Sequence, residues 1–281
     1  MVTKTKNFYF IGFGNMAEAI YLRMDKKSYS NIFFIEKSDD RRKKLIESSF
    51  SKENVMKDLN KVLINSPDII FLAVKPSQIK SICTQIKPII KKSSPLIISI
   101  AAGVTLTKLK KYLANKDDCY LVRAMPNLCA KTGTSITGLF GSSFSKAFGP
   151  KGGRKLGKQV SKIFTSFGQV LWVEQESDLD AITAISGSGP AYIYYIMNAM
   201  IDAAMEFGLK RSDAQRLVAQ TIIGAGETGK NIANLKDEII KVSSKGGTTE
   251  KAIDIFKQKK LDAIIKQALK AAYKRSKELS K

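Results

Sequence analysis

The stretch that decides the fold is "FYFIGFGNMAEAI", residues 8–20. Its opening apolar run predicts a buried strand over 8–12, and a helix is expected from Met16. Between them, Gly12, Gly14 and Ala17 follow a G-x-G-x-x-A spacing. The first glycine permits a tight turn, the second lets a pyrophosphate approach the backbone, and Ala17 allows close contact between helix and strand. Because the first N–H groups of a helix hold phosphates, the stretch predicts a dinucleotide-binding unit.

The alternation of strand and helix continues downstream. Further apolar runs at 32–36, 68–74 and 96–102 alternate with helical patterns at 39–48 and 77–87. Strands that are apolar throughout must be covered on both faces, so we expect a mainly parallel, doubly wound sheet. Later strands are expected at 119–125, 134–140 and 169–173, with a helix over 144–166.

After Val173 the pattern becomes entirely helical, with segments at 178–185, 190–207, 212–229, 234–242, 249–257 and 260–279. "ISGSGPAYIYYIM", residues 185–197, predicts a tight loop that opens a buried central helix. So small a bundle is expected to complete its core against a second subunit. The predicted fold class is therefore α/β, a Rossmann-type doubly wound sheet over 1–173 followed by an all-helical dimerisation domain over 174–281.

The charge balance is strongly basic and uneven. The formal net charge is +22, and residues 1–173 hold 30 Lys or Arg against 11 Asp or Glu. A nucleic-acid binder would interleave its basic residues with exposed aromatics, whereas here they are scattered, as in "DDRRKK". We therefore expect a solvated basic surface that is compatible with a phosphate-bearing small ligand, and no nucleic-acid partner.

The three cysteines form no CxxC pair, so neither a disulfide framework nor a metal site is expected, and a reducing cytoplasmic location is the prediction. No apolar run reaches the roughly 20 residues of a membrane span, so no membrane partner is expected. The N-terminal run is interrupted by Gly12, Gly14 and Asn15, which argues against a signal peptide.

The end of the second predicted strand bears on the choice of nucleotide. Glu36 could accept a hydrogen bond from a free ribose hydroxyl, which favours NAD. A 2′-phosphate, which marks NADP, is favoured by its basic and hydroxyl neighbours Lys37, Ser38, Arg41 and Arg42. These residues leave both nucleotides open.

Three further stretches lie at strand ends or before a helix, and each is either part of a ligand site or an ordinary turn. "AVKP" (73–76) and "SIAAG" (99–103) end two predicted strands, where small residues let a flat ring approach the backbone. "SSKGGTTEK" (243–251) precedes an apolar helix and forms either an anion-binding nest or a plain helix cap.

Taken together, these stretches resemble pyrroline-5-carboxylate reductase, a family that reduces a cyclic imine to L-proline in the last step of proline biosynthesis. The resemblance runs from "IGFGNMAEAI" through "FLAVKP", "SIAAGVT" and "RAMPN" (123–127) to "AISGSGPAYIYY" and "GGTT". It implies an NADP(H)-dependent oxidoreductase, with NAD(H) as the alternative and no metal. It also implies a homodimer or higher homo-oligomer whose active site lies between a nucleotide domain and a helical domain.

The resemblance also implies roles for individual residues. Cofactor contacts fall on Gly12, Gly14, Asn15, Met16, Ala17, Lys37, Ser38, Asn60, Ala73, Val74, Lys75, Pro76, Ala101, Ala102 and Gly103. The substrate carboxylate falls to Ser244, Gly246, Gly247 and Thr248, and Thr249 is the catalytic hydroxyl that meets the ring nitrogen. This chain departs from the family at Lys245, where proline is usual, and at Leu128.

The chain has no histidine, the usual acid–base side chain of hydroxy-acid dehydrogenases. A protonated imine accepts hydride directly, so positioning of donor and acceptor is sufficient. A hydroxy-acid dehydrogenase of the same build predicts a catalytic lysine in 190–207, which contains none. A non-catalytic nucleotide sensor would not need the "GGTT" stretch, and a nucleic-acid binder would need neither motif.

Overall fold

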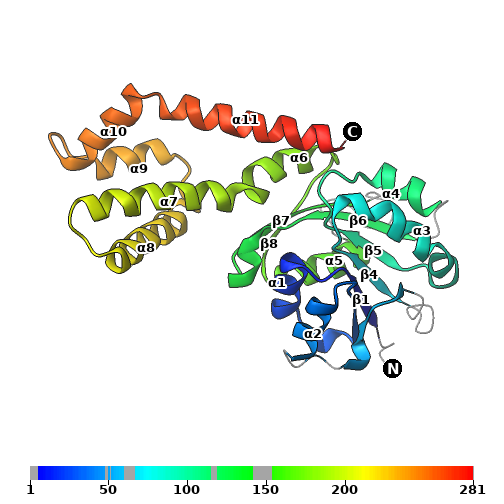
Figure 1. The fold of residues 1–281 in the computed structure, drawn as a ribbon. Coiled ribbons are helices and arrows are strands. Elements are labelled where there is room, and N and C mark those ends of the chain that lie inside the picture. Colours follow the sequence, from blue (N-terminus) through cyan, green and yellow to red (C-terminus); the bar gives the residue numbers. More distant parts are fainter. Residues whose placement is uncertain are drawn as a thin grey trace. The chain divides into compact units, whose positions relative to one another are not determined.

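The computed structural model describes residues 6–47, 50, 52–59, 67–114, 119–141 and 154–280 (Figure 1). The chain divides into two compact units by its contacts. The first is Met1–Ser188 together with Ala272–Lys281, and the second is Gly189–Ala271. The domain boundary expected after Val173 stays a prediction, whereas the boundary between the two compact units falls after Ser188.

The first unit is built on an eight-stranded sheet in the order β3-β2-β1-β4-β5-β6-β7-β8. All pairs of neighbours are parallel except β6 and β7. The order reverses between β1 and β4, which is where an open parallel sheet leaves a crevice at its carboxyl ends. The strands are β1 (Asn7–Ile11), β2 (Asn31–Ile35), β3 (Val55–Met56), β4 (Ile69–Leu72), β5 (Leu96–Ser99), β6 (Tyr120–Met125), β7 (Ser135–Gly141) and β8 (Gly168–Trp172).

Helices cover both faces of this sheet. They are α1 (Asn15–Arg23), α2 (Asp39–Glu47), α3 (Pro76–Ser93), α4 (Leu106–Leu113), α5 (Lys155–Thr165) and α6 (Asp178–Ile182). Successive residues of β1 point to opposite faces: Phe8 and Phe10 pack in one cluster with α1 and α5, and Tyr9 packs in the other with α3 and α4. The mainly parallel, doubly wound sheet is thus confirmed, whereas α4 and the antiparallel pair were not predicted.

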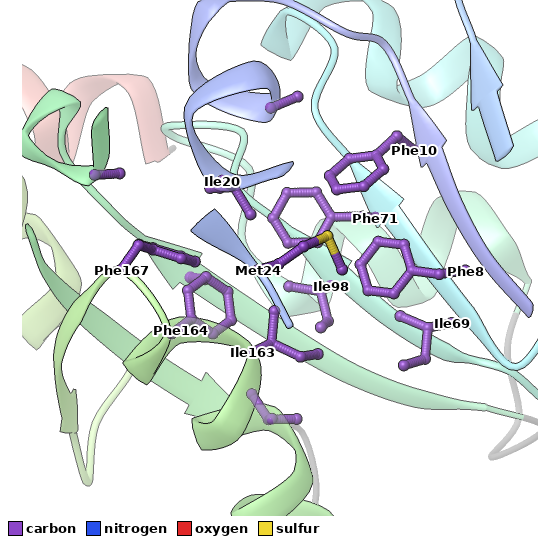
Figure 2. Close-up of a cluster of buried hydrophobic side chains, with 14 of the residues drawn as sticks. Phe8, Phe10, Ile20, Met24, Ile69, Phe71, Ile98, Ile163, Phe164 and Phe167 are labelled. Atoms are coloured by element: carbon purple, nitrogen blue, oxygen red, sulfur yellow. The ribbon is translucent and has the colours of Figure 1, made fainter. Parts of the chain in front are cut away.

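Aromatic side chains fill the core on the α1 and α5 face (Figure 2). Phe8, Phe10, Phe71 and Phe164 are fully buried, and the rings of Phe10 and Phe34 stack at 5.6 Å. Burying one such side chain stabilises a fold by about 1.5–3 kcal/mol. The cluster therefore holds β1 firmly at the centre of the sheet, directly before the glycine turn.

The second unit is helical, as expected. Its helices are α7 (Gly189–Glu206), α8 (Arg211–Gly229), α9 (Leu235–Val242), α10 (Thr248–Gln258) and α11 (Leu261–Ser280), the last of which ends in the first unit. Within the described residues, no helix combines the length and apolarity needed to cross a membrane.

The prediction of a tight loop before α7 is wrong. Residues 183–187 form a π-helical turn, η7 (Thr183–Gly187), and α7 begins two residues later at Gly189. Pro190 stands in the first turn of α7, where a helix needs no backbone N–H, so the chain stays helical through the glycines.

The expectation that α7 is buried is also wrong for a single chain. Every residue of α7 is described, and only Ile201 among them is buried. Tyr195 is 79% exposed, and Tyr194 and Ile196 are exposed as well. An apolar helix face of this kind is typical of a surface that binds another protein, a membrane or a ligand.

A buried ion pair ties three elements of the first unit together. Arg123 in β6 is 1% exposed, and its Nη1 lies 3.2 Å from Glu176 Oε1. The same oxygen accepts a hydrogen bond of 2.7 Å from the N–H of Leu106, the first residue of α4. Glu176 therefore joins β6 and the start of α4 to the segment before α6.

Replacing Glu176 with alanine should strip a buried guanidinium of its counter-charge. We expect the free energy of unfolding, measured by urea denaturation of the full chain, to fall by about 3–5 kcal/mol. Glu174, two residues earlier and exposed, provides the matched control Glu174→Ala. Equal stability of the two variants would contradict the role given to the pair.

Candidate dinucleotide and substrate sites

A pocket of about 1070 Å³ opens at the carboxyl ends of β1, β2 and β4. This volume suits a ligand the size of a dinucleotide, and the place is the crevice expected from the strand order. Eight of the predicted cofactor residues line it: Gly12, Gly14, Asn15, Lys37, Ser38, Ala73, Val74 and Lys75.

The turn at Gly12 brings the end of β1 against the end of β4. Gly12 has φ of +84°, and its N–H donates to Ile35 O at 2.8 Å. A β-carbon there would lie 2.7 Å from Val74 Cγ1 and 2.9 Å from Ala73 O, so only glycine fits. Gly14 has φ of −82° and is the N-cap of α1, which directs the N–H groups of that helix start toward the pocket.

The other predicted cofactor residues near this pocket lie behind its lining. Ala17 is fully buried and Met16 packs against the same aromatic core, so both hold α1 against the sheet. Pro76 is the first residue of α3, where its fixed φ suits a helix start. Asn60 falls outside the described residues.

Glu36 shapes the pocket through its own backbone contacts. Its Oε2 accepts the N–H of Phe13 and its Oε1 accepts the N–H of Ser38, both at 3.0 Å. Each carboxylate oxygen thus already accepts a hydrogen bond from the turns beside it. Arg41 lines the pocket and donates to Phe13 O. Arg42 is not part of the lining and donates to the carbonyls of residues 36 and 37.

The lining also contains residues that the sequence analysis missed. Lys57 adds a fourth cation beside Lys37, Arg41 and Lys75. A polar stripe on α3 faces the pocket at Ser77, Gln78, Ser81 and Gln85, with the three- and four-residue spacing of one helix face. The spacing of these four polar residues could have revealed the stripe from the sequence alone. Lys57 could not be found in this way, because it follows a strand of only two residues, too short to show a pattern.

Three of the motif stretches meet at the carboxyl ends of β5 and β6, apart from the lining of this pocket. Ala102 packs against the buried cluster of Met125, Val173 and Leu179, and the N–H of Ala101 donates to Ser99 Oγ at 3.3 Å. The side-chain amide of Asn127 donates to Ser186 O, in the π turn, at 3.1 Å. "SIAAG", "RAMPN" and "AISGSG" therefore form one cluster, which includes the predicted residues Ala101, Ala102 and Gly103.

The predicted substrate loop lies in the helical unit and is a tight turn. The N–H of Gly247 donates to Ser244 O at 2.9 Å, and Gly246 has φ of +75°, as the third residue of a type II turn requires. Lys245 takes the second position, which proline favours but most residues tolerate. Glu250 Oε2 accepts the N–H of Gly246 at 2.7 Å. Because α10 begins at Thr248, the N–H groups of Thr248 and Thr249 are the first of that helix and have no partner within it.

The described part of the chain shows neither a cluster of metal-binding side chains nor a reactive thiol at Cys83. No group of three or more His, Cys, Asp or Glu side chains gathers there in a way that could hold a metal ion. Burial raises the pKa of the Cys83 thiol to about 12, so this cysteine acts as a packing residue. The expectation of a metal-free enzyme stays a prediction.

Comparison with known proteins gives matches to both parts of the chain. Residues 176–279 match the family model "Pyrroline-5-carboxylate reductase dimerisation", and residues 7–103 match "NADP oxidoreductase coenzyme F420-dependent". The chain is 34% identical over 279 residues to the pyrroline-5-carboxylate reductase of Pseudomonas aeruginosa, covering 98% of this chain and 97% of that protein. It is 32% identical to the enzyme of the same name from Pasteurella multocida, over 99% of each chain.

Solved structures are similar over the same length. A pyrroline-5-carboxylate reductase from Coxiella burnetii has 35% identity and a TM-score of 0.81, covering 99% of this chain and 100% of that one. The pyrroline carboxylate reductase of Plasmodium falciparum, solved with NADP bound, has 28% identity and a TM-score of 0.81, over 99% of each chain.

The two glycines of the turn should respond differently to substitution. Gly12→Ala forces a left-handed backbone onto alanine and a clash with β4, so it should destabilise the fold by about 2 kcal/mol or more. Gly14→Ala meets only the flexible end of Arg41, at 3.1 Å, so the fold should persist. Its β-carbon would obstruct the pyrophosphate, and the Kd of a nicotinamide dinucleotide should rise at least about tenfold.

Thermal unfolding and fluorescence titration with the dinucleotide measure these two effects. The matched control is Gly208→Ala, at a positive φ with open space around it in the helical unit. If Gly14→Ala bound dinucleotide with unchanged affinity, the pyrophosphate would not lie at this turn.

Proposed function

This chain belongs to the family of pyrroline-5-carboxylate reductases, and we propose that it binds NADPH in the pocket beside Gly12 and the substrate carboxylate at the turn of residues 244–248. The family consists of NAD(P)H-dependent oxidoreductases that reduce the cyclic imine to L-proline in the last step of proline biosynthesis. The observation that carries the assignment of the nucleotide is the left-handed backbone at Gly12, packed against Ala73 and Val74.

The choice of NADPH over NADH is supported by the surroundings of Glu36. An NAD-selective carboxylate accepts a hydrogen bond from the ribose hydroxyl, and each oxygen of Glu36 already uses one of its two acceptor sites for a backbone N–H. Four cations, Lys37, Arg41, Lys57 and Lys75, line the same pocket. A 2′-phosphate is a dianion with several acceptor oxygens, so this set of donors suits NADPH.

The turn before α10 suits a carboxylate. The first amides of α10, at Thr248 and Thr249, are the donors that a helix start offers to an anion. The hydroxyl of Ser244 lies beside Gly247, the residue before them. The Thr249 hydroxyl orients the ring nitrogen. When bound, the dihydronicotinamide supplies the hydride, and the protein holds the two rings in contact without a histidine.

A homodimer is the proposed assembly. Residues 176–279, which match the dimerisation family model, include many large apolar side chains that are exposed in the single chain. These include Tyr194, Tyr195, Ile196, Phe207, Leu217, Ile223, Ile239, Ile240 and Val242. A second copy of the segment would remove this surface from water, which is favourable by about 25 cal/mol per Å². A cytoplasmic location is proposed because the three cysteines are an odd number and form no CxxC pair.

The direct test of the function is oxidation of NADPH by the purified chain, followed at 340 nm with and without pyrroline-5-carboxylate. Loss of NADPH should depend on the imine and yield proline. Thr249→Val, which removes the hydroxyl, should lower kcat at least about tenfold, whereas Thr249→Ser should keep most of it.

Thr221→Val, on an exposed face of α8, is the matched control for this series. No imine-dependent oxidation in the wild type would refute the function. Wild-type kinetics in Thr249→Val would refute only the role of that hydroxyl.

Selectivity between the nucleotides should depend on Arg41. Arg41→Ala should raise the KM of NADPH at least about tenfold through loss of a charge-assisted contact, and leave the KM of NADH within about twofold. Lys43→Ala, on an exposed face of the same helix, should change neither value. Equal changes for both nucleotides in Arg41→Ala would show that Arg41 does not contact a 2′-phosphate.

A further inference from the structure

The end of α11 is fastened to α6 by a buried carboxylate. Asp180 is 5% exposed, and its Oδ1 accepts hydrogen bonds from Ser276 Oγ at 2.7 Å and from Ser280 Oγ at 3.0 Å. The end of α11 lies beside α6 in Figure 1, and both belong to the first unit. Two hydroxyls one helical turn apart thus converge on one oxygen.

The same end of α11 touches the loop that follows β5. Gly103 has φ of +73°, and a β-carbon there would lie 2.6 Å from Leu279 O and 2.8 Å from Leu279 Cβ. The backbone of Gly103 therefore lies directly against the last turn of α11. Leu279 falls between the two serines that Asp180 holds, so its position depends on them.

The rest of this loop is held from other sides. Ser99 Oγ accepts the N–H of Ala101, Ala102 packs against the buried cluster that includes Met125, and Glu176 accepts the N–H of Leu106. From α11, Leu279 contacts this loop at Gly103. α11 begins at Leu261, shortly after the end of α10, the helix that opens with the substrate turn.

We propose that Asp180 is a positioning residue for the reduction. By holding Ser276 and Ser280, it seats Leu279 against Gly103 and so sets the backbone of residues 101–103 for the nicotinamide ring. Asp180 is not among the residues that line the nucleotide pocket. This inference rests on the proposed function, because that function assigns residues 101–103 to the nicotinamide.

The test compares two variants of the full chain, one that loses and one that keeps the hydrogen bonds between residue 180 and the end of α11. The triple variant Asp180→Ala/Ser276→Ala/Ser280→Ala removes the carboxylate and both donors together, so no buried polar group is left unpaired. Asp180→Asn keeps an oxygen that accepts from both hydroxyls. Lys274→Ala, on an exposed face of α11, is the control.

The triple variant should lose about tenfold in kcat with NADPH and pyrroline-5-carboxylate, because a small misplacement of reacting groups is costly. Its Kd for 2′,5′-ADP, a probe of the adenosine half of the nucleotide alone, should match the wild type. Asp180→Asn and Lys274→Ala should stay within about twofold of wild-type kcat.

Wild-type kcat in a folded triple variant would overturn the proposal, as would an equal loss of kcat and of 2′,5′-ADP affinity. If the triple variant does not fold, Ser280→Ala, which removes only the longer bond, should show a smaller drop in kcat, and no drop would overturn the proposal. Absence of activity in the wild type would instead refute the proposed function and this inference with it.

Discussion

The left-handed backbone at Gly12 is the constraint on which the pocket depends. Aromatic packing of Phe8 and Phe10 fixes β1 in the middle of the sheet, and the chain must then turn within van der Waals contact of Ala73 and Val74 at the end of β4. Only a residue without a β-carbon can make that turn. The turn directs the start of α1 toward the crevice where the strand order reverses. The position of the anion-binding helix start therefore depends on the turn, and the position of the turn depends on the packing of the core.

Much of this could be predicted from the sequence because its signals are local. Apolar strands, helical periods and the glycine spacing each act within a few residues. They predicted the sheet and the helical second unit, and part of the pocket lining, including Gly12, Gly14 and Ala73. The family and its reaction, expected from the motifs, are confirmed by relatives of similar length.

The errors and omissions have nonlocal causes. Gly-Pro at 189–190 indicated a loop, but proline in the first turn of a helix leaves the helix intact. Burial of α7 was inferred from its composition, yet burial depends on what packs against a helix, and within one chain little does. Glu176 and Asp180 could not be singled out, because their partners at Arg123, Leu106 and Ser276 lie far away in sequence.

A chain without histidine must rely on geometry, and the central claim is that hydride passes directly from the nucleotide beside Gly12 to the imine carbon. NADPH deuterated at carbon 4 of the nicotinamide tests this most directly, with the proline analysed by mass spectrometry and NMR. We expect one deuterium on the δ-carbon of proline, which was the imine carbon, delivered by only one of the two labelled faces of the nicotinamide. Proline that carries solvent hydrogen at that carbon with both labelled forms would contradict it.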